Sequence, residues 1–351
     1  MLRLTTELGI DQPIVLGPFG GASSVPLTAL VSNRGGLGSY GLYGYSAERI
    51  ASVCADLRAA TERPFAVNLW LPTGDEVTPQ DVPPTASDAI VELLEEVGAP
   101  IPDAPDAYVP SFDEQFEAVL AARPAVLSLV YGVPPLDVID RAHEAGIKVI
   151  ATATTVDEAV ALDLGGVDAI VASGAEAAGH RVSFLNPALL SLVGTFSLVP
   201  QVADAVRTPV LAAGGIADRR GVAAAFALGA DGVVVGTAFL RTRESAICES
   251  YRRAIHTSRA HDTVLTSAMS GRLSRGLPNR AVRLIEERGD ALPFPAQNWL
   301  TGRFRALAAQ ADRADLLSLW MGQSAPLAFR ALADDVFTEL AAGVPAAAGT
   351  A

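Results

Sequence analysis

The stretch DAIVASGAEAAGH, residues 168–180, combines residue types that could bind and process a ligand. A short apolar run leads directly into a loop of small residues that ends at His180. The unperturbed pKa of a histidine lies near neutrality, so His180 could act as a general base or donate a hydrogen bond to an anion. Small residues let a flat ligand approach the backbone closely. Glu176, four residues earlier, could be part of the same site or could cap a helix.

Two further turns carry glycine where a phosphate could bind. Gly214-Gly215 lies in AAGGI and Gly236-Thr237 lies in VGT, each directly after an apolar run. Backbone N–H groups and the start of a helix can bind phosphate at such turns, because no Cβ blocks the approach. Either turn alone could be an ordinary tight connection, but the pair favours a phosphate site.

The remaining reactive side chains do not form a recognisable set. The other three histidines, His143, His256 and His261, are scattered, and no Ser-His-Asp set or P-loop motif is present. Cys54 and Cys248 are not in a CxxC pattern, so neither a zinc site nor a disulfide framework is indicated. No metal site is predicted.

Composition limits the classes of function. The 351 residues are 50% hydrophobic and carry a net charge of −13, which argues against a nucleic-acid or anionic-membrane surface. The amino-terminal segment is too short and polar for a signal peptide, and no apolar run reaches transmembrane length. We expect a cytoplasmic protein that binds neither nucleic acid nor membrane, with residues 346–351 as a flexible tail.

Eight short apolar runs alternate with helical patterns, and these elements must position the candidate residues. The runs are continuous rather than alternating, which is typical of strands that are buried on both faces of a parallel sheet. The predicted strands cover residues 13–16, 37–40, 65–71, 125–130, 148–152, 169–173, 209–213 and 232–235. The predicted helices cover residues 26–34, 46–60, 87–97, 112–122, 136–145, 156–164, 187–206 and 222–228, with a possible break near Gly194 or Pro200.

This alternation predicts an α/β protein of the TIM (β/α)₈ barrel class. Eight βα units over about 240 residues match that fold, whereas an open doubly wound sheet would not need eight repeats. In a TIM barrel the loops that follow the strands meet at one rim, where active sites lie. The loops with His180, Gly214-Gly215 and Gly236-Thr237 should therefore face one another, with the phosphate after strands seven and eight.

Two segments interrupt the barrel pattern. Residues 72–110 are rich in proline and acids, and residues after about 241 are helical in pattern with their own turn signals. We therefore predict a barrel formed by residues 1–72, 119–242 and 315–345. Residues 73–118 and 243–314 are predicted to form a smaller, mostly helical domain that closes over the site or makes a dimer contact, so a monomer or a homodimer is expected.

A set of sequence segments resembles the nitronate monooxygenases, formerly called 2-nitropropane dioxygenases. The likeness extends over nearly the whole chain and preserves the order of the segments. They are LGIDQPIVLGPFGG, VSNRGGLGSYG, RPFAVNLWLP, TATTVDEA, GVDAIVASGAEAAGHRVSF, TPVLAAGGIADRRGVAAAFALGADGVVVGTAFL and SGRLSRGLPN.

The resemblance implies an FMN-binding barrel that oxidises alkyl nitronates with O₂ to a carbonyl compound and nitrite. His180 matches the family's active-site histidine, which takes a proton from a neutral nitroalkane or positions a nitronate. The FMN phosphate would lie on Gly214, Gly215, Gly236 and Thr237. The flavin ring would be lined by Pro18, Phe19, Gly20, Asn68, Thr154 and Gly179.

The chain departs from the family pattern at two positions. Phe19 stands in PFGG where the family often has PMAG, and Ala178 stands in EAAGH where EAGGH is usual. Both changes alter the size of the pocket, so they affect the expected substrate more than the cofactor. The resemblance also leaves open a flavin-dependent enoyl-thioester reductase or an NAD(P)H:quinone reductase, and more remotely a non-catalytic FMN-binding protein.

Overall fold

Eight parallel strands form a barrel, as the alternation of apolar runs predicts. The computed structural model describes residues 3–82, 87–289 and 291–346. The strand order is β1-β9-β8-β6-β5-β4-β3-β2. Backbone hydrogen bonds from Leu16 N–H to Leu37 O and from Leu37 N–H to Ile14 O, both 2.9 Å, close the barrel between β1 and the residue before β2. The strands are β1 (Ile14–Leu16), β2 (Gly38–Gly41), β3 (Phe65–Trp70), β4 (Val126–Val130), β5 (Lys148–Ala153), β6 (Ala169–Ser173), β8 (Val210–Ala213) and β9 (Gly232–Val235).

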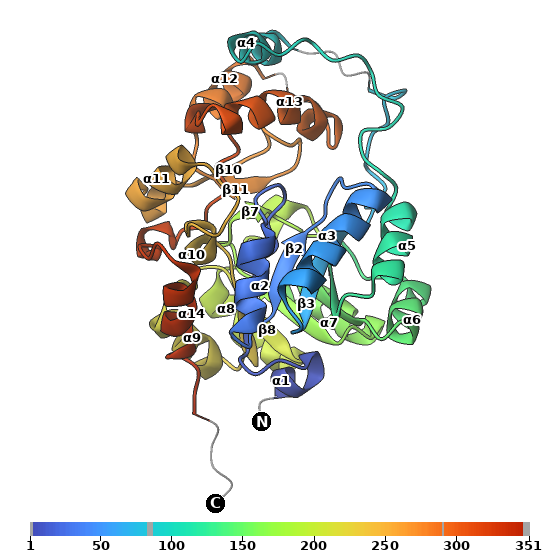
Figure 1. Ribbon diagram of the computed structural model, residues 1–351, viewed down its shortest axis with the longest axis vertical. Helices are drawn as coiled ribbons and strands as arrows, with labels where there is room; N and C mark the ends of the chain where they lie inside the picture. The colour runs from blue at the N-terminus through green and yellow to red at the C-terminus, as the bar shows by residue number, and fades with distance from the viewer. Residues whose placement is uncertain (1–2, 83–86, 290, 347–351) are drawn as a thin grey trace, which may run out of the picture.

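Helices surround the barrel (Figure 1), and most of them begin where a polar side chain caps the first turn. Ser24, Ser46, Thr155 and Asp218 each accept a hydrogen bond from a backbone N–H of the helix that follows. The helices beside the barrel are α2 (Val25–Asn33), α3 (Ala47–Ala60), α5 (Phe112–Ala122), α6 (Leu136–Glu144), α7 (Val156–Gly165), α8 (Thr195–Ala205), α9 (Arg219–Ala227), α10 (Thr237–Leu240) and α14 (Ala333–Ala341).

Two local features differ from the sequence prediction. The stretch 187–206 is one short 3₁₀ turn, Ala188–Leu190, followed by α8, so its break lies at Gly194 and not at Pro200, which lies inside α8. Helix α1 (Arg3–Leu8), which was not predicted, closes the end of the barrel opposite to the loops that follow the strands. Its fully buried Leu4 and Leu8 pack against Val15 and other residues inside the barrel.

A second layer, which we call the cover, lies over the carboxyl ends of the barrel strands (Figure 1). It contains α4 (Asp88–Glu96), α11 (Glu249–Thr257), α12 (Arg280–Arg288), α13 (Ala296–Gln310), β10 (Val264–Thr266) and β11 (Ser274–Gly276). Helix α4 packs against α12 and α13, whereas α5 packs against α3 at the side of the barrel. The grouping of residues 73–118 with 243–314 into one domain stays a prediction.

Two short strands that were not predicted lie within the mostly helical region after residue 241. Strands β10 and β11 form an antiparallel sheet with β7 (Gly179–His180), in which Ser274 pairs with His180. Strands of three residues are too short to show an alternating pattern in the sequence. The small sheet forms because β7, in the loop after β6, pairs with β11, which in turn pairs with β10.

The ends of the chain add two observations. Of the predicted tail, residues 347–351 lie outside the described residues. Within the described ranges, no helix has both the length and the apolar character that crossing a membrane would need.

Candidate active site

A cavity of about 930 Å³ lies between the barrel and the cover, at the carboxyl ends of the strands. Loops from far-separated parts of the sequence converge on it, as expected for a TIM barrel. His180 and nine of the ten predicted cofactor residues line this cavity. Those nine are Pro18, Phe19, Gly20, Asn68, Gly179, Gly214, Gly215, Gly236 and Thr237.

Thr154 is the one predicted residue that the structure does not bring to the cavity. Its side chain is fully buried, and its hydroxyl contacts Glu158 Oε2 at 2.7 Å and Ser183 Oγ at 2.8 Å. Glu158 also accepts a hydrogen bond from the N–H of Phe184, at 2.7 Å. Thr154 and Glu158 therefore anchor the segment that follows His180, while Thr152 at the end of β5 lines the cavity.

The loop before His180 is held by charged side chains that bind its backbone. The buried Arg181 donates to the carbonyl oxygens of Gly174, at 2.8 Å, and Ser173, at 3.1 Å, and Arg275 donates to that of Ala175, at 2.9 Å. Because three consecutive carbonyl groups of this loop accept hydrogen bonds from arginine side chains, the backbone conformation of the loop is well defined. The backbone that carries His180 is therefore held in place by these hydrogen bonds.

Glu176 caps a helix, which was the second of the two roles considered for it. Its carboxylate accepts hydrogen bonds from Thr195 N–H and Thr195 Oγ1–H, both at 2.9 Å, at the start of α8. The residue that precedes this helix is Gly194, which has no side chain to cap it. Glu176 thus links the His180 loop to α8.

His180 lies between aromatic rings and is hydrogen-bonded to the cover. Its Nε2 is 2.9 Å from Ser270 Oγ, and its ring lies edge-on to Trp70 and Trp320, at centroid distances of 4.9 and 5.6 Å. Burial, together with the positive charges of Arg272 and Arg305, lowers the pKa of His180 to about 3. The imidazole is therefore neutral at physiological pH.

The two glycine turns form a surface of free backbone N–H groups. Gly214 and Gly215 have φ of +97° and +75°, a conformation that glycine adopts without strain. The N–H groups of Gly214, Gly215, Gly236 and Thr237 donate no hydrogen bond to any described residue. Such a set fits a phosphate, which accepts several N–H bonds at once.

A segment that the sequence did not indicate completes this surface. Gly322 N–H donates to Thr237 Oγ1 at 3.0 Å, and Gln323 N–H donates to the carbonyl oxygen of Glu176 at 3.0 Å. A Cβ at position 322 would lie 2.7 Å from that same carbonyl oxygen, so glycine is required there. Ser324, two residues on, also lines the cavity.

Asn68 presents an acceptor to the cavity from the middle of β3. Its Nδ2 donates to the carbonyl oxygen and the hydroxyl of Ser128 on β4, at 3.1 and 3.2 Å. These bonds fix the orientation of the amide and leave Oδ1 without a partner among the described residues. Oδ1 can therefore accept a hydrogen bond from a bound ring N–H.

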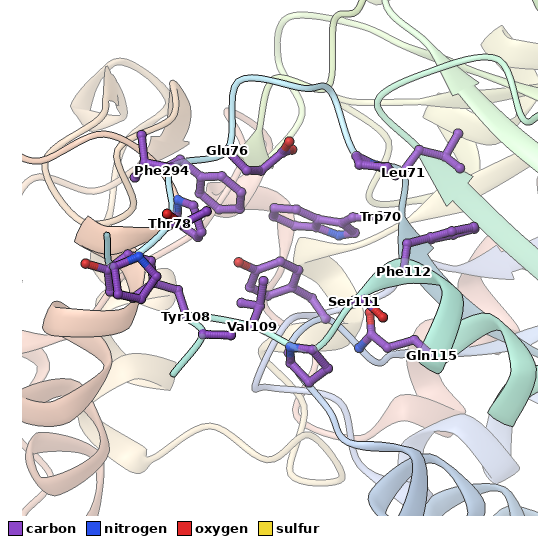
Figure 2. Close-up of a pocket in the computed structure, with 18 of the residues that line it drawn as sticks. Trp70, Leu71, Glu76, Thr78, Tyr108, Val109, Ser111, Phe112, Gln115 and Phe294 are labelled. Carbon is purple, nitrogen blue, oxygen red and sulfur yellow. The ribbon is translucent and has the colours of Figure 1, made fainter. Parts of the chain in front are cut away.

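A second cavity, of about 450 Å³, lies beside the first and shares part of its wall. Figure 2 shows Trp70 and Phe294 next to one another in the lining of the second cavity, and their ring centroids are 5.8 Å apart. Tyr43, Trp70, Tyr108 and Val109 line both cavities. These residues are the partition between the active-site cavity and a mainly apolar side chamber.

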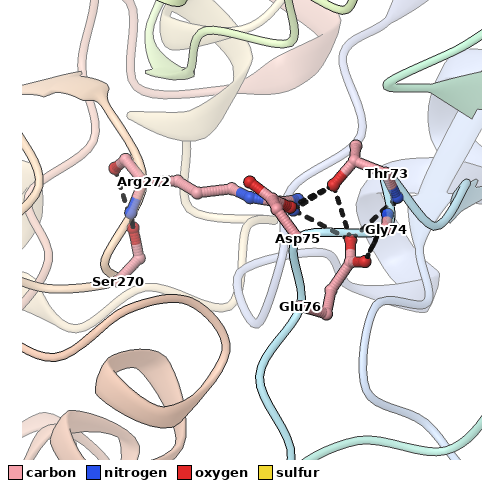
Figure 3. A network of polar contacts seen from close by, with 6 residues as sticks. All are labelled: Thr73, Gly74, Asp75, Glu76, Ser270 and Arg272. Carbon is pink, nitrogen blue, oxygen red and sulfur yellow. Dashed lines mark hydrogen bonds and ion pairs between the residues drawn. The ribbon is translucent and has the colours of Figure 1, made fainter.

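Arg272 fastens the cover to the segment after β3, as Figure 3 shows. Its guanidinium contacts Glu76 Oε1 at 2.8 Å and also bonds to Thr73 and Asp75, and it lies 4.0 Å from the centre of the Phe294 ring. Burial alone would raise the pKa of Glu76, but hydrogen bonds from Thr73 and Arg272 outweigh it and lower this pKa to about 2. The charge of Arg272 is thus balanced by carboxylates.

Sequence reasoning missed most of the residues that the cover contributes. Ser270, Arg305 and Trp320 come from separate segments, and the sequence gives no local sign that they face His180. Only the SGRLSRGLPN segment, which contains Ser270 and Arg272, stood out, through its resemblance to a family motif.

Taken together, the barrel, the glycine turns after its last strands and the neutral histidine at its rim define a TIM-barrel enzyme. A comparison with protein families then identifies which one: the family model described as nitronate monooxygenase matches residues 2–341. The chain belongs to the nitronate monooxygenase family, a family of flavin-dependent oxidoreductases, as the resemblance indicated.

Individual relatives agree with this assignment. A probable nitronate monooxygenase of Staphylococcus aureus is 38% identical over 340 residues, which are 93% of this chain and 92% of the relative. The crystal structure of nitroalkane oxidase from Streptomyces ansochromogenes is similar with a TM-score of 0.84 and 33% identity, over 97% of this chain and 98% of that one. FabK from Thermotoga maritima is less similar, with a TM-score of 0.76 and 30% identity over 97% and 94% of the two chains.

Proposed function

We propose that this protein is an FMN-dependent enzyme that oxidises alkyl nitronates with O₂, releasing a carbonyl compound and nitrite. The observation that carries the proposal is a neutral His180 in the same cavity as a phosphate-sized set of free backbone N–H groups. Membership of the nitronate monooxygenase family supports the reaction, and the nitroalkane oxidase from Streptomyces ansochromogenes supports the substrate class.

FMN fits the residues that line the cavity. Gly214, Gly215, Gly236 and Thr237 would hold its phosphate, with Ser324, from the segment that follows α13, as a further donor. Its ring would lie beside Pro18, Phe19, Gly20 and Gly179, with Asn68 Oδ1 as an acceptor. When bound, FMN would accept electrons from the substrate and pass them to O₂.

His180 is better suited to a nitronate than to a neutral nitroalkane. A histidine whose pKa is about 3 is a weak base, so it would remove a carbon-bound proton slowly. A nitronate has already lost that proton and needs only to be bound and oriented. We therefore assign His180 the orientation of the nitronate, with proton abstraction as a slower activity.

Ser270 can support His180 in this role. When the Ser270 hydroxyl donates to Nε2, the neutral imidazole carries its proton on Nδ1, which has no partner among the described residues. Nδ1–H can then donate to a nitronate oxygen. The same hydroxyl lies 3.0 Å from the carbonyl oxygen of Arg272, and donation there would leave Nδ1 as the basic nitrogen instead.

The experiment that tests the proposal is anaerobic mixing of the flavin-loaded protein with three separate reductants. We expect propyl-2-nitronate to bleach the flavin, with nitrite and acetone formed once air is admitted. Neutral 2-nitropropane should bleach it much more slowly, because His180 is a weak base. Rapid bleaching by NADH or NADPH, with no response to the nitronate, would instead support the enoyl-thioester or quinone reductase and overturn the proposal.

A further inference from the structure

Arg305, on the α13 wall of the active-site cavity, is a cation without a carboxylate partner. Its guanidinium donates to Ser318 Oγ at 3.0 Å, to Asn298 O at 2.9 Å and to Asn298 Oδ1 at 2.8 Å, all of which are neutral acceptors. Among the described residues no Asp or Glu forms an ion pair with it. Arg272, by contrast, is paired with Asp75 and Glu76.

Two buried donors in this region have no acceptor. Arg305 Nε and Tyr43 Oη are both buried, and neither has a hydrogen-bond partner among the described residues. The Tyr43 hydroxyl is close enough to Arg305 to affect its pKa, and Asn298 lies beside that hydroxyl without hydrogen-bond geometry. A buried polar group without a partner costs free energy, so such groups in native proteins generally have a reason.

Both groups keep their protons at physiological pH. Burial raises the pKa of Tyr43, so its hydroxyl stays protonated. Burial lowers the pKa of Arg305 to about 10, which leaves the guanidinium charged. Two buried donors in the same region, together with a positive charge that no carboxylate balances, fit an acceptor that is an anion.

We propose that Arg305 and Tyr43 are the residues that bind the nitronate oxygens and so select the anionic form of the substrate. This inference rests on the function proposed above. A nitronate carries its charge on a planar pair of oxygens, the shape that a guanidinium recognises best. Because His180 is neutral, it contributes no positive charge, and Arg305 supplies the charge that a nitronate needs.

The test compares variants for binding of isobutyrate, an unreactive anion whose planar carboxylate resembles the nitronate group and whose size is about that of propyl-2-nitronate. Calorimetric titration of the flavin-loaded protein gives its dissociation constant, and steady-state turnover gives KM and kcat for the nitronate. We expect Arg305→Met to weaken isobutyrate binding and to raise KM about 10- to 100-fold, the range for a lost charged hydrogen bond. Arg305→Lys, which keeps the charge but loses the planar fork, should fall between this variant and the parent protein.

Arg283→Met is the control, because it removes one positive charge from the exposed face of α12, outside the cavity. Its isobutyrate binding should stay within twofold of the parent value. Flavin content is measured in each variant, so that misfolding is recognised, and Tyr43→Phe tests the second donor without removing the ring.

The result that would overturn the inference is an Arg305→Met protein with full flavin and an unchanged dissociation constant and KM. An effect on isobutyrate with no effect on the KM of the nitronate would also reject it. Failure of the proposed function looks different: the parent protein would then not oxidise the nitronate at all, whether or not isobutyrate binding depends on Arg305.

Discussion

The barrel side and the cover side of the active-site cavity present different kinds of polar group. On the barrel side the proposed phosphate site consists of the backbone N–H groups of Gly214, Gly215, Gly236 and Thr237, beside the side chains of Asn68 and His180. On the cover side the polar groups are side chains, of which Ser270 and Arg305 contact or face His180. The barrel side therefore depends on backbone conformation, whereas the cover side depends on which residues tertiary packing brings together.

We propose that this difference separates cofactor binding from substrate selection. Backbone donors at the ends of parallel strands are the same in many TIM barrels, so they suit a group such as phosphate that many enzymes share. Side chains on a cover can change without disturbing the barrel, so they suit recognition of one substrate. Phe19, Ala178 and Arg305 all line the cavity, and we propose that they set the size and charge of the pocket.

The most far-reaching effect is expected on the barrel side, at Gly215, because loss of the flavin would abolish the whole reaction. Gly215→Val places a β-branched residue at φ +75°, which costs on the order of 1–3 kcal/mol, and adds methyl groups next to the proposed phosphate. We expect flavin content to fall at least tenfold, measured from the absorbance ratio of flavin to protein after gel filtration.

The control for this change is Gly146→Val. Gly146 has nearly the same φ, +77°, but lies after α6 and outside the cavity. It should carry the same backbone strain and keep its flavin. If both variants retain stoichiometric flavin, the glycine turns do not form the phosphate site.

The next effect should come from His180, where the barrel loop meets the cover. His180→Gln keeps a polar side chain of similar size, so flavin should be retained. Turnover of propyl-2-nitronate, measured as nitrite released, should fall about 10²–10⁴-fold, the range for loss of a positioned acid, base or orienting group. Unchanged nitrite release would remove His180 from the proposed mechanism.

The same contrast explains what the sequence could and could not predict. Every barrel strand lies within one residue of its predicted range, because strands buried on both faces appear as continuous apolar runs. Barrel topology then places the loops after the strands on one rim, which is why the loops of His180 and of the glycine turns were predicted to face one another, and they do line one cavity. Arg305 and Ser270 were missed because only tertiary packing brings α13 and the β10–β11 loop to His180. Thr154, which the family resemblance placed beside the flavin, lies one residue beyond β5 and is bonded to Glu158, while Thr152 lines the cavity, so its contact with a flavin stays a prediction.

A smaller effect is expected on stability as the pH falls. The pKa of His180 is about 3 in the folded protein and about 6.5 in the unfolded chain, so between these values only the unfolded chain takes up the proton. The free energy of unfolding should therefore decrease below pH 6.5, by about 2 kcal/mol at pH 5 from this group alone.

His180→Gln removes this contribution, so its urea midpoint should fall less between pH 7.5 and pH 5 than that of the parent protein. His261→Gln is the control, because the side chain of His261 is 74% exposed. An equal loss of stability in the parent and in His180→Gln would show that His180 is not held in its neutral form by burial.

The smallest effect is expected at the Arg272 contacts, where the cover is fastened to the segment after β3. Glu76 and Asp75 bind the same guanidinium, but their side chains are 24% and 73% exposed. Glu76→Gln should lower the free energy of unfolding by about 1 kcal/mol, since a partly buried charged hydrogen bond is lost, and Asp75→Asn by about 0.3 kcal/mol. Urea unfolding of both variants measures the difference. Equal effects of the two substitutions would mean that burial does not strengthen the ion pair between Arg272 and Glu76. The charge of Arg272 would then not be balanced more strongly than that of Arg305, which has no carboxylate partner.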